Sequence, residues 1–273
     1  MSTSTGTTSL PRRQTTPIPV GLLAAVGVAF LAIPLIGLLL TTPWARLPEL
    51  LTSPVAAEAL RLSLITSISA TVIAVLIGVP LAWVLARGRV PGRTFIRALV
   101  TLPLVLPPVV GGVALLLAFG RRGLIGQYLY DWFGVQLPFS TAGVIMAEAF
   151  VAMPFLVITV EGALRSADPR FEEAAATLGA SRWTILRRVT LPLIGPALIA
   201  GAILAWARAL GEFGATITFA GNLPGVTQTL PLAVYSALDT DREAAIALSL
   251  VLLVASLAVL LLLRDRYLRG SGS

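Results

Sequence analysis

Long apolar segments make up most of this chain, and short polar stretches separate them. Five runs without a charged residue are each long enough to cross a hydrocarbon core of roughly 30 Å, which takes about 20 helical residues. These runs are 18–45, 62–86, 98–120, 189–207 and 244–263, and a sixth segment, 141–160, carries one acid, Glu148. Their length without strand-like alternation predicts an all-α membrane protein with about six transmembrane helices.

The composition agrees with a membrane protein and removes several kinds of chemistry. Hydrophobic residues make up 56% of the 273 residues, charged residues make up 12%, and the mean hydropathy is +0.90. Cysteine and histidine are absent, so no disulfide, metal site or resident cofactor is expected. All 20 basic residues are arginines. Without lysine the phosphate-binding pattern GxxxxGK(S/T) cannot occur, so we expect a non-catalytic chain whose partner hydrolyses any nucleotide.

The arginines lie mainly at one set of helix ends, which predicts the orientation in the membrane. Alternate connections hold fourteen on one side and five on the other, with Arg208 inside a span. The larger set is Arg12, Arg13, Arg87, Arg89, Arg93, Arg97, Arg165, Arg170, Arg182, Arg187, Arg188, Arg264, Arg266 and Arg269. The smaller set is Arg46, Arg61, Arg121, Arg122 and Arg242. The positive-inside rule then places both termini in the cytoplasm, and this topology explains the net charge of +7 without a nucleic-acid partner.

We expect a disordered cytoplasmic N-terminus over residues 1–17, a transmembrane domain over 18–268 and a C-terminal tail over 269–273. The Ser/Thr-rich start ends in an arginine pair before an apolar run, an order that also occurs in cleaved signal peptides. That run is longer than the usual ~7–15-residue signal core, and no A-x-A site closes it. A retained first helix is therefore the favoured interpretation.

Proline and glycine are frequent inside the predicted spans. Proline frees backbone carbonyls, and glycine lets helices approach closely. Two interpretations stay open: ordinary packing of a bundle, or kinked helices that move as part of a pore. The positions are Pro80, Pro103, Pro107, Pro108, Gly111, Gly112, Pro154, Pro192 and Pro196.

The polar stretch 166–192 predicts a short helix, a turn and a second helix between the fourth and fifth spans. Asp168 suits the N-cap and Pro169 the first helical position. Gly179 fits the left-handed residue that ends the first helix, and Ser181 can cap the second. We therefore expect a helix-turn-helix that faces the cytosol.

Alanines at positions 174 and 175 leave one face of the first short helix nearly without side chains. A partner surface can then press against the helix backbone. Alternatively, the alanines are only good helix formers in a connecting segment. The residues alone leave both interpretations open.

The spacing of Glu173-Ala174-Ala175, of Gly179 and of Leu191-Pro192 resembles the EAA loop of permease subunits of bacterial ABC importers. The resemblance implies a type I ABC importer permease fold. It also implies that the first short helix is the coupling helix, which docks in a groove of a separate ATPase subunit. Carried over onto this chain, the ATPase-coupling positions are Glu172, Glu173, Ala174, Ala175 and Gly179.

The stretch 207–238, ARALGEFGATITFAGNLPGVTQTLPLAVYSAL, closely resembles the fifth-span and external-loop signature of molybdate/tungstate permeases, and more loosely that of sulfate permeases. The resemblance implies an importer that moves molybdate or tungstate across the cytoplasmic (inner) membrane of a bacterium by alternating access. Its implied partners are a second copy of this chain, two cytoplasmic ATPase subunits, an extracytoplasmic molybdate-binding protein and membrane lipid. Sulfate or another oxyanion is the alternative substrate.

Arg208 and Glu212 are four residues apart, and on one helix face they would pair. The pair is either a structural clip between helices or part of the route of the oxyanion. The residues predicted for the translocation path or gate are Arg208, Glu212, Gly214, Thr216 and Thr218.

Two other polar features have open or competing interpretations. Residues 227–229, Thr-Gln-Thr, are either hydrogen-bond donors to an arriving oxyanion or, as we favour, a solvated loop that meets a binding protein. The role of Glu148 is left open, because a membrane acid can mark a pathway or be hydrated near the surface.

Two other classes of protein compete with an ABC permease. A secondary transporter coupled to protons or sodium needs ion-binding acids near the middle of the membrane, and usually has repeated halves. The few intramembrane acids and the EAA-like loop speak against it. A scaffold or sensor would need neither the proline-rich spans nor the Arg208–Glu212 pair.

Overall fold

The computed structural model describes residues 17–88 and 90–269. The predicted disordered N-terminus and the C-terminal tail fall outside this part of the chain, apart from Pro17 and Arg269. Every regular element in the described ranges is a helix, which confirms the predicted all-α class. The helices are α1 (Ile18–Thr41), α2 (Leu47–Thr52), α3 (Pro54–Arg87), α4 (Arg93–Val105), α5 (Pro108–Phe119), α6 (Gly126–Phe133), α7 (Thr141–Ser166), α8 (Arg170–Thr177), α9 (Arg182–Ile185), the π-helix η1 (Leu186–Thr190), α10 (Leu191–Leu193), α11 (Gly195–Leu210), α12 (Gly214–Ala220), α13 (Leu230–Thr240) and α14 (Arg242–Arg269).

The chain divides into two compact units, residues 1–42 and 43–273. The first unit contributes helix α1, which has 24 residues, a mean hydropathy of 2.7 and no buried residue. A helix that is apolar on all sides matches a surrounding of acyl chains or other apolar helices. α1 is therefore suited to cross a membrane.

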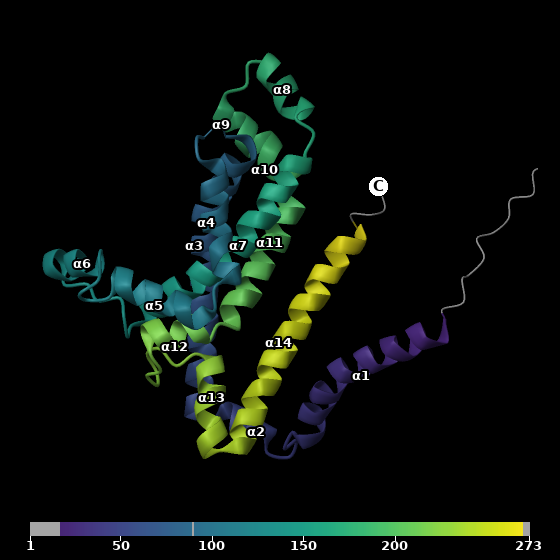
Figure 1. Cartoon of the computed structure of the whole chain (residues 1–273), viewed down its shortest axis with the longest axis vertical. Coiled ribbons are helices and arrows are strands. Elements are labelled where there is room, and N and C mark those ends of the chain that lie inside the picture. Colours follow the sequence, from purple (N-terminus) through teal and green to yellow (C-terminus); the bar gives the residue numbers. More distant parts are fainter. Residues whose placement is uncertain (1–16, 89, 270–273) are drawn as a thin grey trace, which may run out of the picture. The chain divides into compact units, whose positions relative to one another are not determined.

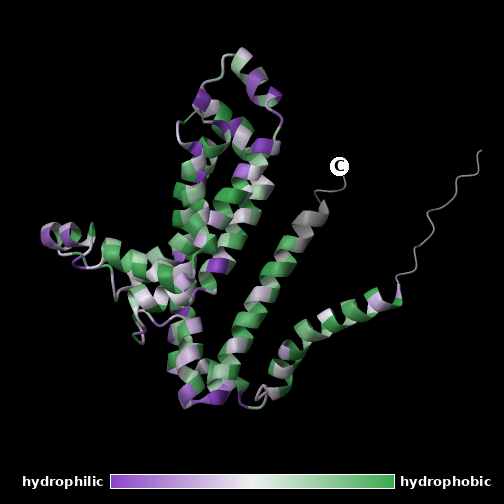
Figure 2. Ribbon diagram, viewed as in Figure 1, coloured by the Kyte–Doolittle hydropathy of each residue, from purple (hydrophilic) through white to green (hydrophobic). Residues whose placement is uncertain are grey.

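The core of the second unit is formed by α3, α7 and α11, which lie side by side (Figure 1). Small residues permit close approach of these helices. A Cβ atom on Gly78 of α3 would lie 3.1 Å from Leu156 and Val157 of α7, and one on Gly201 of α11 would lie 3.2 Å from Leu156. Figure 2 shows apolar residues along the long helices and polar residues gathered at the ends of the bundle.

Within the described ranges, four helices are long and apolar enough to span a membrane: α1, α3, α7 and the part of α14 up to Leu261. The segment from α9 to α11 also qualifies, as a pair bent by 72° at Ile194. The predicted span 98–120 differs from expectation, because it is divided into α4 and α5. Leu106 and Pro107 between them are extended, since the residue before a proline avoids helical angles and residues 107 and 108 are both prolines.

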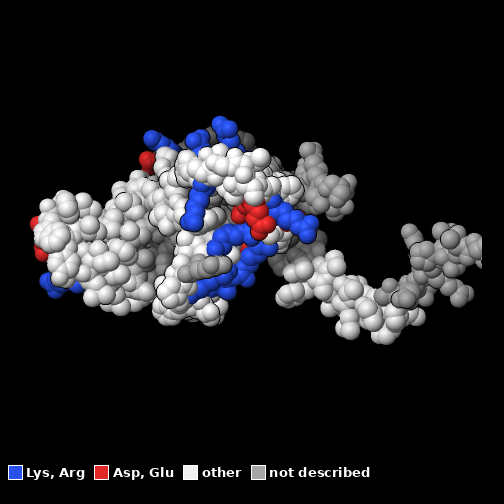
Figure 3. Space-filling view, turned by 90° about the horizontal axis from the view of Figure 1, so that it is seen from above, with Lys and Arg blue, Asp and Glu red and all other residues white. Residues whose placement is uncertain are grey.

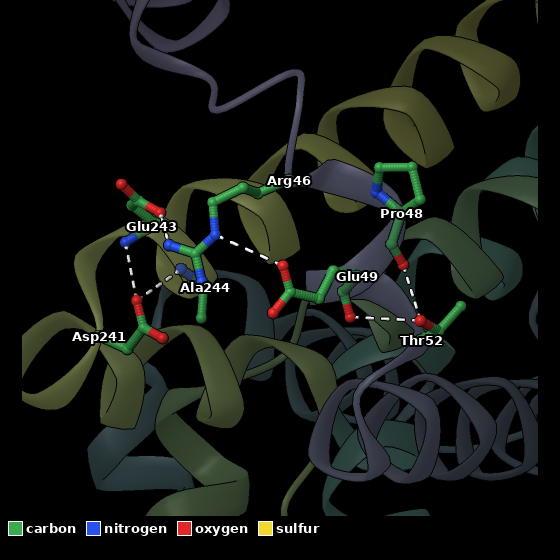
Figure 4. Close-up of polar contacts among 7 residues, drawn as sticks. All are labelled: Arg46, Pro48, Glu49, Thr52, Asp241, Glu243 and Ala244. Atoms are coloured by element: carbon green, nitrogen blue, oxygen red, sulfur yellow. Dashed lines mark hydrogen bonds and ion pairs between the residues drawn. The ribbon is translucent and has the colours of Figure 1, made fainter.

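The end of the bundle opposite α8 is tied together by charged groups of α2 and α14 (Figure 4). Arg46 pairs with Glu49 at 3.5 Å and with Glu243. The Asp241 carboxylate accepts the backbone amides of Glu243 and Ala244, each at 3.1 Å, and so caps α14. The hydrogen bond to Glu49 and the negative charges of Glu243 and Glu49 raise the pKa of Arg46 above its ordinary value.

Candidate coupling loop and translocation path

The short helix α8 begins at Arg170, one residue later than the sequence predicts. The Asp168 carboxylate accepts the backbone amide of Arg170 at 2.9 Å, and the amide of Glu173 donates to the carbonyl of Pro169 at 3.0 Å. Asp168 therefore accepts the first helical amide, but the helix starts one residue later than predicted, with Pro169 instead of Asp168 as its N-cap.

The turn after α8 has the predicted left-handed glycine. Gly179 has φ +81°, its amide donates to the carbonyl of Ala176 at 3.0 Å, and the amide of Ala180 donates to the carbonyl of Ala175 at 3.1 Å. These two hydrogen bonds form a Schellman motif, which satisfies the last carbonyls of the helix. The Ser181 hydroxyl then accepts the amide of Thr184 at 3.2 Å, so the predicted cap of the second short helix is confirmed.

The predicted coupling residues do not all point the same way. Glu173 and Ala174 are exposed, and so are two apolar side chains of the same loop, Phe171 (59% exposed) and Leu178 (88%). Glu172 instead turns toward the bundle, where its carboxylate accepts a hydrogen bond from the Thr190 hydroxyl at 3.0 Å and lies 3.7 Å from the Arg87 guanidinium. α8 thus presents one face outward and is held from the other.

Basic side chains lie around a small acidic patch at the surface of this end of the bundle (Figure 3). Beneath the surface, arginines also pair with a buried acid. Glu161 of α7 lies between Arg97, at 2.5 Å, and Arg165, at 2.9 Å. Arg87 donates to the carbonyl of Ala167 at 3.2 Å, which ties the end of α3 to the start of the loop. Glu161 was not predicted as a functional residue. Its position four residues before Arg165 could have indicated an ion pair on one helix face.

The π-helix η1 was not predicted either. The amide of Leu191 donates to the carbonyl of Leu186, five residues back, instead of four. Pro192 follows at once and has no amide to donate, so a regular α-helical ladder cannot continue through it. The passage from the loop into the membrane is therefore a wide turn followed by the bend at Ile194.

Arg208 and Glu212 form the predicted pair, but not on one helix face. The distance between Nη2 and Oε2 is 2.5 Å, and Glu212 is 1% exposed. α11 ends at Leu210, so Glu212 lies in the turn before α12, where its other oxygen accepts the amide of Ala215 at 2.7 Å. The expectation of a shared helix face is wrong because the helix stops first, and the carboxylate joins two helices instead.

Gly214 and Thr218 lie where α12 crosses α5. A Cβ atom on Gly214 would lie 2.8 Å from the Cβ of Pro108, and one on Gly112 would lie 2.7 Å from the Cβ of Thr218. Thr216 is fully buried, and its hydroxyl has no hydrogen-bond partner in the described part of the chain. These residues pack α12 against its neighbours, and their role in a translocation path stays a prediction.

Glu148 is buried in the centre of the bundle. It is 1% exposed, and one carboxylate oxygen accepts the Thr66 hydroxyl at 2.9 Å. Thr66 belongs to a polar stripe of α3 that also includes Ser63, whose hydroxyl accepts the amide of Leu230 at 2.6 Å, and Ser67, which accepts the indole N–H of Trp206 at 3.1 Å. The spacing i, i+3, i+4 of these hydroxyls was a signal that the sequence analysis missed.

Residues 227–229 are not a solvated loop. Thr227 is 0% exposed, Gln228 8% and Thr229 1%. The Thr227 hydroxyl accepts the amide of Leu223 at 2.8 Å, and Gln228 donates to Ser236 of α13 at 3.4 Å. The favoured interpretation is wrong because all three residues are buried, and Thr227 and Gln228 form hydrogen bonds within the chain.

The sequence matches the family described as binding-protein-dependent transport system inner membrane component over residues 74–269. It is 52% identical to the molybdenum transport system permease protein ModB of Mycobacterium tuberculosis over 238 residues, 87% of this chain and 90% of that protein. Identity to ModB of Escherichia coli K12 is 44% over 77% of this chain and 92% of that protein. The sulfate transport system permease protein CysT of Escherichia coli K12 is 39% identical over 80% of this chain and 78% of that protein.

Solved structures share the fold. A bacterial ABC transporter involved in the import of alginate superposes with a TM-score of 0.72, at 20% identity, over 92% of this chain and 94% of that one. The MetNI methionine ABC transporter gives a TM-score of 0.55 at 20% identity, over 80% of this chain and 96% of that one. The predicted type I ABC importer permease fold is confirmed, and with it the resemblance drawn from the EAA-like loop. The chain belongs to the family of inner membrane components of binding-protein-dependent transport systems, and it is the membrane-spanning, non-catalytic permease subunit.

Proposed function

We propose that this chain is the permease subunit through which molybdate enters the cell, in an importer driven by ATP. The observation that carries the proposal is the identity of 52% and 44% to two permeases named for molybdenum transport, over nearly the whole of each. Permeases named for sulfate transport are less similar, at 39%. Tungstate shares the tetrahedral shape and charge of molybdate and is expected to use the same path.

The proposed assembly is a homodimer of this chain with two cytoplasmic ATPase subunits and an extracytoplasmic molybdate-binding protein. α8 is the proposed docking site of the ATPase, because Phe171 and Leu178 are exposed and nothing in the described part of the chain covers them. An outside partner that buries them would gain apolar contact area. The arginine count supports a cytoplasmic location of the α8 end and of both termini.

The proposed mechanism is alternating access by rigid-body movement of the two bundles. Closure of the ATPase subunits around ATP would pull the two α8 helices together. Glu172 would carry this movement into the bundle, because its carboxylate contacts Arg87 at the end of α3 and Thr190 of η1. η1 leads through α10 and the bend at Ile194 into α11, which ends near Arg208 and Glu212, so a displacement of α8 would reach the proposed gate along continuous chain.

The path residues are proposed to act by holding the gate rather than by binding the anion tightly. Arg208 keeps 27% of its side chain exposed, while its partner Glu212 is buried. A guanidinium that is already neutralised by a carboxylate attracts an oxyanion weakly, which suits conduction. The buried Thr216 would reach the anion only after α12 has moved.

Transport in proteoliposomes tests the proposal. The chain is co-purified with its ATPase, reconstituted, and supplied with binding protein and radioactive molybdate. We expect uptake that requires both ATP and binding protein, that tungstate inhibits strongly, and that sulfate inhibits weakly. Equal inhibition by sulfate would favour the sulfate alternative. Uptake by this chain alone under a proton or sodium gradient would instead make it a secondary transporter.

A further inference from the structure

An apolar cavity lies between α3 and the segment from α9 to α11, close to the α8 end of the bundle. Its volume is about 540 Å³, which lies within the range of roughly 300–1,000 Å³ typical of ligand pockets. Thr190 is the only lining residue without an apolar or aromatic side chain. Representative lining residues are Leu76, Pro80, Trp83, Trp183, Leu186 and Ile194.

The cavity opens to the outside of the bundle. Leu76 is 68% exposed, Trp183 65% and Trp83 38%, although all three line the cavity. Tryptophan is enriched where membrane helices meet the headgroup region, because its ring is apolar and its N–H is polar. Trp83 of α3 and Trp183 of α9 are exposed at the cavity, as tryptophans at a membrane–water boundary are.

The π-helix places charge next to this mouth. Its wide turn brings Leu186, Thr190 and Leu191 to the cavity wall, while Arg187 and Arg188 between them are exposed. The Arg187 guanidinium lies 5.9 Å from the centre of the Trp183 ring. Arg182 is exposed one residue before Trp183. No acid in the described ranges forms an ion pair with any of these three arginines.

We infer that this cavity binds one anionic phospholipid of the cytoplasmic leaflet. An acyl chain would fill the apolar space between α3 and α11. The phosphate-bearing headgroup would lie among Arg182, Arg187 and Arg188, whose charge no neighbouring acid cancels. Basic residues near a membrane surface each attract an anionic lipid by about 1 kcal/mol, which corresponds to about fivefold in affinity per arginine.

The position of the lipid links it to the coupling helix. Thr190 lines the cavity and donates its hydroxyl to Glu172 of α8 at 3.0 Å. A bound acyl chain therefore packs against the residue that holds α8 to the bundle. An effect on ATPase stimulation rests on the proposed function, whereas lipid binding itself does not.

Lipid retention tests the inference without ATP, molybdate or binding protein. The permease–ATPase complex is exchanged into nanodiscs that contain phosphatidylglycerol and phosphatidylcholine in equal amounts, then released and weighed by native mass spectrometry. We expect retained phosphatidylglycerol on the wild-type complex. The double variant Arg187→Gln/Arg188→Gln should retain about 25-fold less, because it removes two of the three charges.

The matched control is Arg121→Gln/Arg122→Gln, which removes an exposed arginine pair next to α6, away from the cavity. It should retain phosphatidylglycerol like the wild type. Equal retention by the Arg187/Arg188 variant and the control, or equal retention of phosphatidylcholine, would overturn the inference.

A second variant tests the apolar part of the site. Leu198→Trp fills the cavity, whereas Leu117→Trp adds the same ring to an exposed position of α5. Only the first should lose the lipid. If Leu198→Trp fails to assemble, the arginine pair alone decides. A crosslink from Trp183→Cys to a second copy of this chain, with no lipid retained, would show that a protein helix fills the cavity and would overturn the inference.

Discussion

Two arginine–glutamate pairs differ in distance and in burial. One lies in the interior of the bundle, and the other lies beside α8. Arg208 and Glu212 are 2.5 Å apart, Glu212 is 1% exposed, and its second oxygen caps α12. Arg87 and Glu172 are 3.7 Å apart, both are about one-fifth exposed, and Glu172 also accepts from Thr190. We call the first pair the clamp, because it is short and buried, and the second the joint, because it is longer and partly hydrated. Adjustment of the joint during a movement of α8 belongs to the mechanism proposed above.

The largest effect is expected where the clamp is broken. Glu212→Ala leaves Arg208 without its partner and the amide of Ala215 without its acceptor, which should destabilise the chain by about 3 kcal/mol. Thermal unfolding of the purified complex measures this. Glu212→Gln is the matched variant, because it keeps an acceptor for Ala215 and loses only the charge, and it should lose less stability.

Exchange of the two charges sharpens this prediction. In Arg208→Glu/Glu212→Arg the ion pair is restored, but an arginine cannot accept the amide of Ala215. We expect partial recovery of stability over Arg208→Glu alone. Full recovery would show that the cap of α12 contributes nothing, and no recovery would show that the charges act separately.

The proposed coupling loop holds Glu172, which pairs with Arg87. The next test therefore changes the shape of this loop. Gly179→Val forces a β-branched residue to φ +81°, which costs roughly 1–3 kcal/mol and should reshape the turn. Molybdate uptake should fall at least tenfold while the chain remains inserted. Gly134→Val carries similar strain at φ +65° after α6, and its uptake should stay near that of the wild type. Equal loss in both variants would mean that strain alone explains the defect.

A smaller effect is expected when the joint is loosened without a change of shape. Thr190→Val removes one hydroxyl donor to Glu172 and keeps the size of the side chain, which costs about 1 kcal/mol. The ratio of molybdate transported to ATP hydrolysed should fall a few fold, with assembly intact. Thr184→Val, whose hydroxyl contacts Ser181 instead, is the control and should keep the ratio. An unchanged ratio in Thr190→Val would remove the joint from the mechanism.

The smallest effect is expected at the opposite end. The Arg46 side chain is exposed, and its pairs with Glu49 and Glu243 compete with water and salt. Arg46→Gln should leave molybdate uptake unchanged, and any loss of thermal stability should vanish at high salt. A loss of thermal stability that does not depend on salt would show that salt does not weaken these exposed ion pairs, as expected instead for the buried Arg208–Glu212 pair.

The sequence predicted those features whose causes lie within a few residues. The left-handed Gly179 and the cap at Ser181 each depend on local hydrogen bonds, and the structure has both. The start of α8 was predicted to within one residue, and Asp168 accepts an amide of its first turn. The apolar runs likewise predicted the long helices α3, α7 and α14, because a span is a property of one continuous segment.

Features that depend on distant partners were missed. The burial of residues 227–229 follows from contacts with α13, and the inward turn of Glu172 follows from Arg87 and Thr190. The polar stripe Ser63, Thr66 and Ser67 gains its meaning only once α7, α11 and α13 are packed against it. The sequence of each of these three segments does not specify which neighbours pack against it.

The division between α4 and α5 has a consequence for what surrounds it. The carbonyl oxygens of Pro103 and Leu104 cannot accept a hydrogen bond from the residue four positions onward. Residues 107 and 108 are prolines, which have no backbone N–H. An unpaired carbonyl in hydrocarbon costs several kcal/mol, so each of these two oxygens needs another hydrogen-bond donor. A neighbouring side chain, water or another polypeptide can supply that donor, within a segment apolar enough to be taken for a simple span.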